Sequence, residues 1–420
     1  MRIPVIAAVM LFVFSFLIDL YIYADVRKAT RRKGWRIAYI ASTVLCWALL
    51  IVTMCMPRRS EDADLLPVMW MLYTYLSIYV GKLGYVLCSL IGRLIQLFHH
   101  KKSGRGRSQR DKNGFVSRWI GFILGVFMFG VMWWGVVYTR RHIEIIDVEI
   151  ASPQIPRQFD GFTIAQISDL HVGTWGNDTT FVSELVDSVN SLHPDLIVFT
   201  GDVVNRETKE ITPFLSTLSR LKAPYGVFSI LGNHDYGDYM DWKNPEDREA
   251  NNRLLANHQK NIGWDLINNE RRFIVKDSDS IMVVGVENWG DPPFPTYGDL
   301  EKALSSSKDS LYNQNDHRFK ILLSHNPAHW DQVVSHDTNF GLTLSGHTHA
   351  MQFEVNLFGW KWSPAKYRYE QWGGLYERLN EQGQPVKLYV NIGAGEVGMP
   401  SRLFRAYPEI TLITLRHQGS

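Results

Sequence analysis

Cysteine is scarce in this chain and is missing from most of it. The sequence has three cysteines in 420 residues, and all of them lie in its apolar first part, at Cys46, Cys55 and Cys88. The part that follows therefore has no disulfide, no cysteine nucleophile and no thiolate metal ligand. Its stability must come from a hydrophobic core, and it is long enough to build one.

Net charge is also nearly absent. The formal value is +2, which gives no signal for a nucleic-acid partner. The even balance hides a change in composition, because up to about Thr139 long apolar runs alternate with basic clusters, and after it the composition is well mixed. That change predicts a membrane domain over residues 1–140 and a second domain over residues 141–420.

Four long apolar runs dominate the first part of the chain. Crossing a bilayer takes about 20 apolar residues. The runs lack polar faces of helical period, which argues against a soluble helical bundle, and the first has no small-residue cleavage site, which argues against a removed signal peptide. The sequence therefore predicts a multi-pass membrane protein whose partner is the lipid bilayer. The runs are Ile3–Ala24, Ile37–Met56, Leu65–Leu97 and Trp119–Tyr138.

Basic residues between the runs predict the orientation. The positive-inside rule makes the most basic links cytoplasmic, which places the second domain on the outer face. Arg140 and Arg141, after the fourth run, favour the opposite orientation. The basic residues are Arg27, Lys28, Arg31, Arg32, Lys33 and Arg36 in the first link, only Arg58 and Arg59 in the second, and Lys101, Lys102, Arg105, Arg107, Arg110 and Lys112 in the third.

The second domain shows strand and helix patterns in alternation, which predicts an α/β fold. The strand run Asp195–Thr200 has four consecutive apolar residues at its centre, as a strand covered on both faces should have. The expected helices are Phe181–Leu192, Ile211–Leu221, Pro245–Asn261 and Asp299–Ser306. The expected strands are an edge strand at Ile143–Ile150, a strand that begins at Phe162, and then Asp195–Thr200, Gly226–Leu231, Phe273–Val275, Ile281–Val286, Lys320–Leu323, Gly341–Leu344, Leu388–Ile392 and Ile410–Leu415.

Five of these strands end at a cluster of Asp, Asn or His. Asp169 and His171 are two residues apart, so on an extended segment their side chains project from the same side. In open α/β sheets, ligand sites lie beyond the carboxyl ends of the strands. Each cluster alone is typical of a turn or a helix cap, but five together predict a shared metal site. The clusters are Asp169-Leu170-His171, Gly201-Asp202, Gly232-Asn233-His234-Asp235, Ser324-His325-Asn326 and Gly346-His347-Thr348-His349.

In this order and at these separations, the clusters resemble the signature of the calcineurin-like metallophosphoesterases. The resemblance covers about Phe162 to His349, with a similar closure to about Leu415, and membrane-attached bacterial members look most similar. It implies an α/β/β/α sandwich for the second domain, preceded by the all-α region of four transmembrane helices. The similarity to bacterial members implies a location in the bacterial inner membrane, and the basic links then predict the catalytic domain on the outer or periplasmic face.

The resemblance further implies a two-metal centre. Asp169, His171 and His349 would hold one ion, while Asn233, His325 and His347 would hold the other. Asp202 would bridge them through its two oxygens. Mixed imidazole, carboxylate and amide ligands suit Mn²⁺, with iron or zinc as alternatives. Two such ions would activate a shared water.

Three further residues in the clusters, His234, Asp235 and Gly346, have expected roles other than metal binding. The resemblance implies that His234 stabilises the phosphoryl oxygens or protonates the leaving group. Asp235 either orients the loop or caps it structurally. Gly346 is expected to give the backbone the freedom by which His347 and His349 face different ions.

The sequence thus predicts a membrane-anchored hydrolase of a phosphoester or pyrophosphate bond, with a lipid or envelope-associated molecule as one candidate substrate. The alternative is a non-catalytic membrane sensor or transporter-associated module that only binds metal. A degenerate binder should have lost ligands, and here every position is filled, which favours the enzyme. The choice among monoester, diester and pyrophosphate stays open, and no specific protein partner is indicated.

Two aromatic segments and two arginines are weaker candidates. The segments either pack in the core or lie at the mouth of the site near the bilayer, where Trp and Tyr are favoured. Arg402 and Arg405 are candidate phosphate contacts by charge alone. The segments comprise Trp289, Pro292, Pro293, Phe294 and Tyr297, and Trp360, Trp362, Tyr367, Tyr369 and Trp372; the histidines expected at the surface or around the site are His193, His258, His317, His329 and His336.

Overall fold

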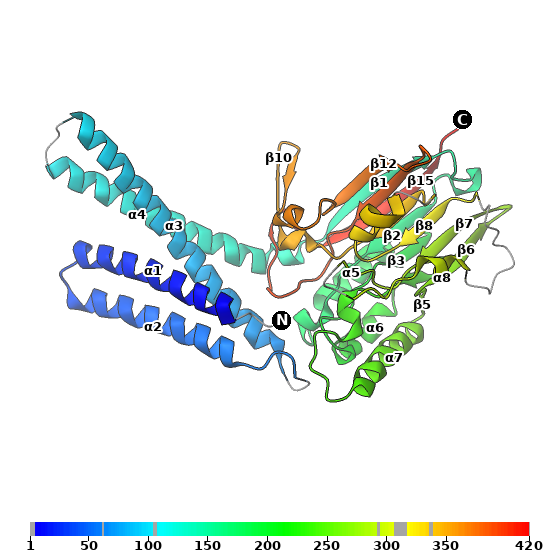
Figure 1. Cartoon of the computed structure of the whole chain (residues 1–420), viewed down its shortest axis with the longest axis horizontal. Helices are drawn as coiled ribbons and strands as arrows, with labels where there is room; N and C mark the ends of the chain where they lie inside the picture. The colour runs from blue at the N-terminus through cyan, green and yellow to red at the C-terminus, as the bar shows by residue number, and fades with distance from the viewer. Residues whose placement is uncertain are drawn as a thin grey trace. The chain divides into compact units, whose positions relative to one another are not determined.

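The computed structural model describes residues 5–60, 63–103, 107–291, 295–305, 317–335 and 339–419. The chain forms two compact units. One comprises Met1–Val137 with Gly398–Ser401, and the other comprises Tyr138–Val397 with Arg402–Ser420. Figure 1 gives the order of their helices and strands along the chain.

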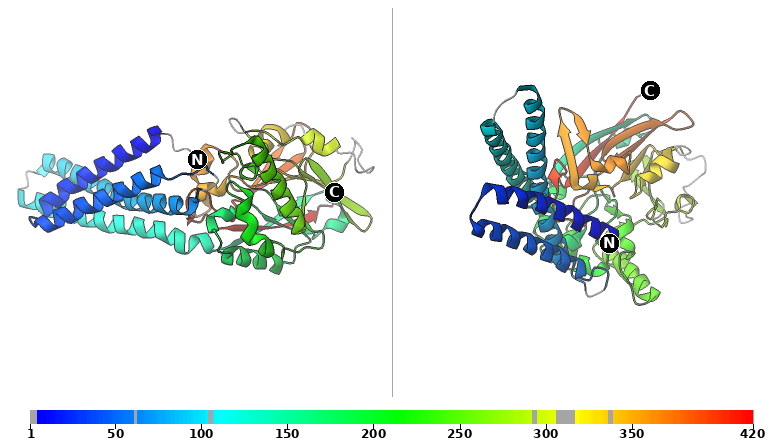
Figure 2. Two further views of the ribbon diagram at one scale, coloured as in Figure 1. Left: turned by 90° about the horizontal axis from the view of Figure 1, so that it is seen from below. Right: turned by 60° about the vertical axis from the view of Figure 1, so that its left-hand side comes forward.

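The first unit consists of four long helices. In two views, α1 runs beside α2, and α3 runs beside α4 (Figure 2). Each contains a window apolar enough to cross a membrane, of which only 17% to 28% is buried within the unit. Most of this apolar surface therefore faces outward, as a bilayer requires. The four predicted spans are confirmed as helices α1 (Val5–Ala29), α2 (Lys33–Cys55), α3 (Leu65–Ser103) and α4 (Arg107–Val137).

The second unit contains two six-stranded mixed sheets among its described residues. In the first sheet β2, β3, β4 and β5 are parallel, and in the second β7, β8, β9 and β13 are parallel. The first sheet has the order β1 (Glu144–Ser152), β15 (Glu409–His417), β2 (Thr163–Ile167), β3 (Leu196–Phe199), β4 (Val227–Ser229) and β5 (Trp264–Leu266). The second has the order β12 (Gly374–Leu379), β13 (Pro385–Val390), β9 (Leu342–Ser345), β8 (Lys320–Leu323), β7 (Asp279–Gly285) and β6 (Glu270–Lys276).

The two sheets pack face to face, with helices on their outer sides. Side chains from both sheets, such as Val198 and Ile321, share one core cluster. The outer face of the first sheet packs against α5 (Thr180–Ser191) and α7 (Pro245–Asn261). The second sheet is covered by α8 (Leu300–Ser305) and by a turn of π-helix, Trp330–Val334. The layers are therefore α/β/β/α, as the resemblance implies, and the all-apolar strands are the ones buried on both faces.

The expected helix at Ile211–Leu221 is wrong in type. The segment forms a 3₁₀-helix, η4 (Thr208–Phe214), followed by one short turn, α6 (Leu215–Leu218). Pro213 lies inside it and has no N–H for an α-helical hydrogen bond. The long helix Pro245–Asn261 and the position of β1 at a sheet edge are both confirmed.

A small third sheet was not predicted. Its order is β11 (Trp360–Trp362), β10 (Phe353–Leu357) and β14 (Leu403–Phe404). The hairpin of β10 and β11 stands out from the two large sheets (Figure 1). Most of its residues in β10 are half-buried and two of the three in β11 are exposed, so the alternation of buried and exposed residues that identifies most strands is weak here.

Candidate metal centre

The carboxyl ends of five strands meet at one place. The loops that follow β2, β3, β4, β8 and β9 bring all the predicted ligand residues together. Their nitrogen and carboxylate oxygen atoms form groups in which all the atoms lie within 4.8 Å of one another. The prediction that five strand ends meet therefore agrees with the geometry of the second unit.

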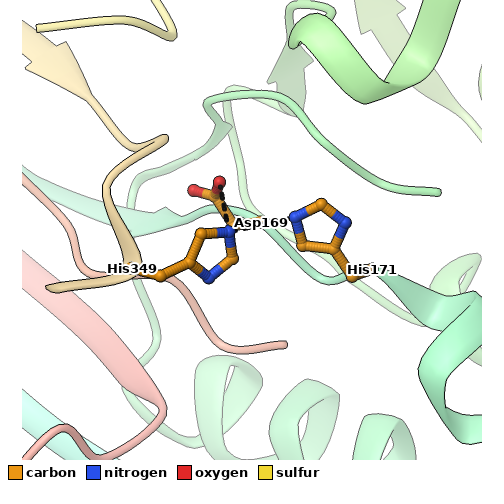
Figure 3. A group of neighbouring side chains, drawn as sticks. All are labelled: Asp169, His171 and His349. Atoms are coloured by element: carbon orange, nitrogen blue, oxygen red, sulfur yellow. Dashed lines mark hydrogen bonds and ion pairs between the residues drawn. The ribbon is translucent and has the colours of Figure 1, made fainter. Parts of the chain in front are cut away.

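The first group contains Asp169, His171 and His349 (Figure 3). His349 Nε2 is 3.2 Å from Asp169 Oδ1 and 3.0 Å from His171 Nε2. Two imidazole nitrogens that face each other in a buried place compete for one proton. Such an arrangement is better satisfied by a cation between them than by a hydrogen bond.

The second group lies around His325. Its Nε2 is 3.1 Å from Asp202 Oδ2, 3.2 Å from Asn233 Oδ1 and 3.2 Å from His347 Nδ1. All four residues follow strand ends, and three of them are buried while His347 is partly exposed. The group combines imidazole, carboxylate and amide oxygen, the ligand set expected from the sequence.

Asp202 belongs to both groups, but through one oxygen. Oδ2 is 3.1 Å from His325 Nε2 and 3.6 Å from His171 Nε2. Oδ1 accepts a hydrogen bond from the backbone nitrogen of His234 at 2.8 Å. Oδ1 therefore also fixes the loop after β4, and the expected bridge between two ions through both carboxylate oxygens stays a prediction.

These residues fit divalent metal ions. Ligands held about 2.0–2.2 Å from one ion lie roughly 3 Å from each other, which matches the separations in both groups. Burial opposes the ionisation of Asp169 and Asp202, yet the neighbouring histidines hold the pKa of both carboxyls below its usual range. Burial lowers the pKa of His171 and His347, which favours the neutral imidazole that metals bind.

Two histidines have their other ring nitrogen fixed by a neighbour. His325 Nδ1 donates to the carbonyl oxygen of Thr200 at 2.7 Å, which leaves Nε2 with its lone pair toward the group. His347 Nε2 lies 2.7 Å from the hydroxyl of Tyr369, which leaves Nδ1 for the group. Such outer partners set the tautomer and the orientation of metal-binding histidines. No pattern of side chains points to Thr200, because its contribution is a backbone oxygen.

His234 lies beside the ligands and has a fixed ring. Its Nδ1 donates to the carbonyl oxygen of Asn205 at 2.5 Å, and the ring stacks on Tyr239 with the centroids 4.2 Å apart. Burial lowers the pKa of His234, and the charge of Asp202 partly offsets this. Nε2 is thus the nitrogen that remains for a substrate, and Asn205 is a positioning residue that sequence reasoning missed.

Asp235 holds two of the loops together. Its carboxylate accepts hydrogen bonds from the backbone nitrogens of Asp202 at 2.8 Å, Val203 at 2.9 Å and Gly232 at 2.9 Å. The loop after β3 is in this way tied to the loop after β4. Asp235 therefore does both things expected of it, because the same buried carboxylate caps the loop and orients the loops that carry the ligands.

The backbone of the site is strained at the ligands themselves. Left-handed φ values occur at Asp169, His171, Asp202, His347 and His349, between 43° and 73°. Residues other than glycine adopt this region at a cost, and such outliers gather at functional sites.

The expected role of Gly346 is therefore wrong. The φ angles of His347 and His349 supply the bend, and Gly346 is needed for space, since a Cβ there would lie 2.0 Å from Ser168 Oγ.

The two candidate phosphate contacts have different outcomes. The prediction for Arg402 is wrong, because Arg402 is fully buried and donates to the carbonyl oxygens of Gly395 and Ile392. Arg405 forms an ion pair with Glu144 and is about half exposed, so its contact with a phosphate stays a prediction.

The weaker candidates divide between core and surface. Trp372 is buried, and Trp289 stacks on the buried His329 with the centroids 5.2 Å apart. Trp360 and Tyr367 are exposed. The remaining candidates Pro292, Pro293, Phe294 and His336 lie outside the described residues.

The chain matches two protein families and a bacterial relative. Residues 162–351 match the family described as "Calcineurin-like phosphoesterase", and residues 1–140 match the one described as "Probable Calcineurin-like phosphoesterase, transmembrane domain". The Bacillus subtilis protein named "Uncharacterized metallophosphoesterase YkuE" is 31% identical over 66% of this chain and 88% of its own.

Two further relatives carry a membrane or a lipid in their names. The Danio rerio "Transmembrane protein with metallophosphoesterase domain" is 28% identical over 67% of this chain and 60% of its own. The Chlamydia trachomatis "UDP-2,3-diacylglucosamine pyrophosphatase LpxG" is 28% identical over 51% of this chain and 73% of its own.

Proposed function

The chain belongs to the calcineurin-like phosphoesterases, and from that premise we propose that it is a two-metal phosphohydrolase embedded in a membrane. It is a hydrolase of phosphoester bonds with an integral membrane part. The proposal adds that the substrate is a phosphoester or pyrophosphate carried by a lipid or another envelope molecule. It also adds that Asp169, His171, Asp202, Asn233, His325, His347 and His349 hold two divalent ions, with Mn²⁺ the expected metal.

The observation that supports the proposal best is the position of Asp202 Oδ2. It faces His325 Nε2 at 3.1 Å and His171 Nε2 at 3.6 Å, so one oxygen links the two ligand groups. A module that only bound metal would not need a second group next to the first. It would not need the fixed ring of His234 beside both of them either.

The chemistry divides between bound ions and side chains. Divalent ions supply an activated water and neutralise negative charge on the phosphoryl oxygens. His234 keeps one proton on Nδ1, which donates a hydrogen bond to the carbonyl oxygen of Asn205. Nε2 can therefore give or take a proton at the phosphoryl or leaving-group oxygen. The hydroxyl of Tyr369 contacts His347 Nε2, the nitrogen that faces away from the ligand group, and the Tyr369 ring packs edge-on against the imidazole.

Hydrolysis of a chromogenic aryl phosphate tests the proposal. The detergent-purified full chain should hydrolyse it with added Mn²⁺, lose activity with a chelator, and regain it when Mn²⁺ is restored. Asp202→Asn should abolish turnover. The matched control is Asp277→Asn, an exposed turn residue whose φ of 55° is close to the 61° of Asp202. Metal binding without turnover by the parent chain would instead favour the sensor or transporter-associated module.

The lipid part of the proposal rests on the relatives and on the membrane unit. One relative is named as a pyrophosphatase of a diacylated sugar nucleotide, and the chain itself has four candidate spans. A panel of lipid phosphates, lipid-linked pyrophosphates and nucleotides, offered to the same preparation, tests it. Preference for water-soluble nucleotides by more than about tenfold in kcat/KM, a difference of roughly 1.4 kcal/mol, would contradict a lipid substrate.

Orientation and membrane identity belong to the proposal as well. The basic links support an orientation with the phosphohydrolase on the outer face, which in a bacterium is the periplasmic side of the inner membrane. Protease added to intact spheroplasts should then degrade the second domain. Protection of that domain until the membrane is opened would reverse the orientation.

A further inference from the structure

The tip of the β10–β11 hairpin exposes a group of apolar side chains. The exposed fraction is 57% for Leu357 and 58% for Trp360, and Phe358 is fully exposed. Phe358, at the tip itself, is the most exposed of the three. A cluster of large exposed apolar residues is unusual on a soluble surface and marks a place of interaction.

The turn at the tip does not need an aromatic residue. Leu357 pairs with Trp360, so Phe358 and Gly359 form a two-residue turn. Both have positive φ, at 51° and 85°. Turns of this type favour Asn-Gly, and a bulky residue at positive φ is disfavoured. The turn would form more readily with Asn at position 358, so the phenylalanine serves something other than folding.

Aromatic rings continue from the hairpin to its base. The ring of Phe353 contacts that of Phe404 at 4.9 Å and that of Trp362 at 5.9 Å, and Trp362 approaches Tyr367 at 6.4 Å.

Exposed basic residues flank these rings. Lys361 and Lys366 are both exposed, and Lys366 lies over the ring of Tyr367. Aromatic rings beside lysines are the composition favoured at the boundary between lipid and water, where lysines meet anionic head groups.

The chain itself brings a bilayer to this sheet. The segment η1 (Thr139–Arg141) directly follows α4 and contacts β14, the strand that pairs with β10. The ring of His142, next in the chain, contacts that of Tyr407 at 4.7 Å. The chain therefore leads from the fourth candidate span directly into a segment that contacts this sheet.

The same sheet is built into the metal site. The hairpin begins just after the ligand His349, and Tyr369, which follows it, contacts His347. Ser363, between β11 and Tyr369, donates to the carbonyl oxygen of Ala350 at 2.6 Å. The base of the hairpin is thus fixed to the ligand loop, while Phe358 at its tip is fully exposed.

We propose that the hairpin tip inserts into the head-group layer of the bilayer in which the chain is embedded. Phe358, Leu357 and Trp360 enter the lipid, and Lys361 and Lys366 remain at the level of the head groups. Because the hairpin base is fixed to the ligand loop, insertion brings the metal site toward the lipid. Its use for a substrate with acyl chains rests on the proposed function, whereas the insertion itself does not.

A fluorophore at the tip tests the insertion. Phe358→Cys is placed in the full chain with Cys46, Cys55 and Cys88 replaced by alanine, and labelled with a polarity-sensitive dye. The protein is reconstituted at one copy per nanodisc of phosphatidylethanolamine and phosphatidylglycerol, with and without a lipid that carries a doxyl quencher. The matched control is Val275→Cys on β6, whose exposed fraction is 56%.

Insertion predicts a blue-shifted emission at position 358 that the doxyl lipid quenches, with water-like and unquenched emission at position 275. Equal emission at the two positions would overturn the proposal. A blue shift that the doxyl lipid does not quench would also overturn it, because protein rather than lipid would then cover the tip.

Kinetics with two phosphates separate this proposal from the proposed function. Phe358→Asp should leave hydrolysis of a soluble aryl phosphate unchanged and slow hydrolysis of a lipid phosphomonoester in the nanodisc by about tenfold, as expected when burial of one large apolar side chain is lost. Equal rates on the lipid for parent and variant would count against the insertion. A parent chain that hydrolyses neither phosphate contradicts the proposed function, while the fluorescence result still decides the insertion.

Discussion

The carboxylate of Asp235 lies 2.8 Å from the backbone nitrogen of Asp202 and accepts its hydrogen bond. Asp235 is fully buried, and it binds the same way to the backbone of Val203 and Gly232. The residue that links the two ligand groups is therefore positioned by a second carboxylate that belongs to neither group.

Removal of this acceptor should destabilise the second domain. Asp235→Ala leaves several buried N–H groups without a partner, and we expect the free energy of unfolding to fall by about 2–4 kcal/mol. Thermal unfolding of the purified chain measures the effect. Asp160→Asn, at an exposed carboxylate that accepts from His417, should change the unfolding free energy by less than about 0.5 kcal/mol. Equal stability of the parent and Asp235→Ala would show that the loops do not depend on this carboxylate.

His234 and His325 should fail in different ways when they are replaced. His234→Gln removes the ring that Asn205 positions but no proposed ligand, so we expect kcat to fall by about 10²–10⁴ while the metal content stays the same. His325→Ala removes a nitrogen that three ligand atoms surround, so the metal content itself should fall. Metal analysis of both variants, with kinetics on an aryl phosphate, separates the two roles. Loss of metal from His234→Gln would make it a ligand instead.

The hydroxyl of Tyr369 should tune metal binding through His347. It lies 2.7 Å from His347 Nε2, and loss of such an outer partner typically weakens metal affinity by about 10–100-fold. Titration of metal-free Tyr369→Phe with Mn²⁺, followed by activity, measures the change. Tyr367→Phe is the matched control, because that ring is 77% exposed. If both variants need the same Mn²⁺ concentration, the hydroxyl does not act on the metal site.

The sequence was sufficient for the layers of the fold and for the residues that gather at the site. Central strands such as β3 are buried on both faces, so their apolar runs are easy to read, and their carboxyl ends must meet in a layered α/β fold. The amphipathic pattern of α5 is equally direct, because one face of that helix enters the core.

The sequence was not sufficient for contacts made by the backbone or across long separations. Thr200 and Asn205 act through carbonyl oxygens, which no side-chain pattern reveals. The buried position of Arg402 depends on the carbonyl groups that surround it, which only the folded chain brings together. The strain at His347 is also a result of tertiary structure, so reasoning from residue types assigned the bend to the neighbouring Gly346.

Glu210 should make the stability of the second domain depend on pH. Burial raises the pKa of Glu210 from 4.5 to about 7, although the backbone nitrogen of Asn205 donates to its carboxylate at 2.6 Å. The folded state then holds the proton more tightly than the unfolded chain does. The contribution of Glu210 is therefore most favourable below about pH 4.5, declines as the pH rises toward 7, and is constant above that.

Replacement by glutamine isolates this effect. Glu210→Gln keeps an oxygen that can accept from Asn205 but has no proton to lose, so the difference in stability between parent and variant should change by roughly 1–3 kcal/mol between pH 4.5 and 7. The parent should lose stability relative to the variant as the pH rises. Chemical unfolding at a series of pH values, with the metal kept absent so that its own pH dependence does not enter, measures the two curves. Curves that stay parallel across this range would mean that the carboxyl of Glu210 titrates alike in the folded and unfolded chain.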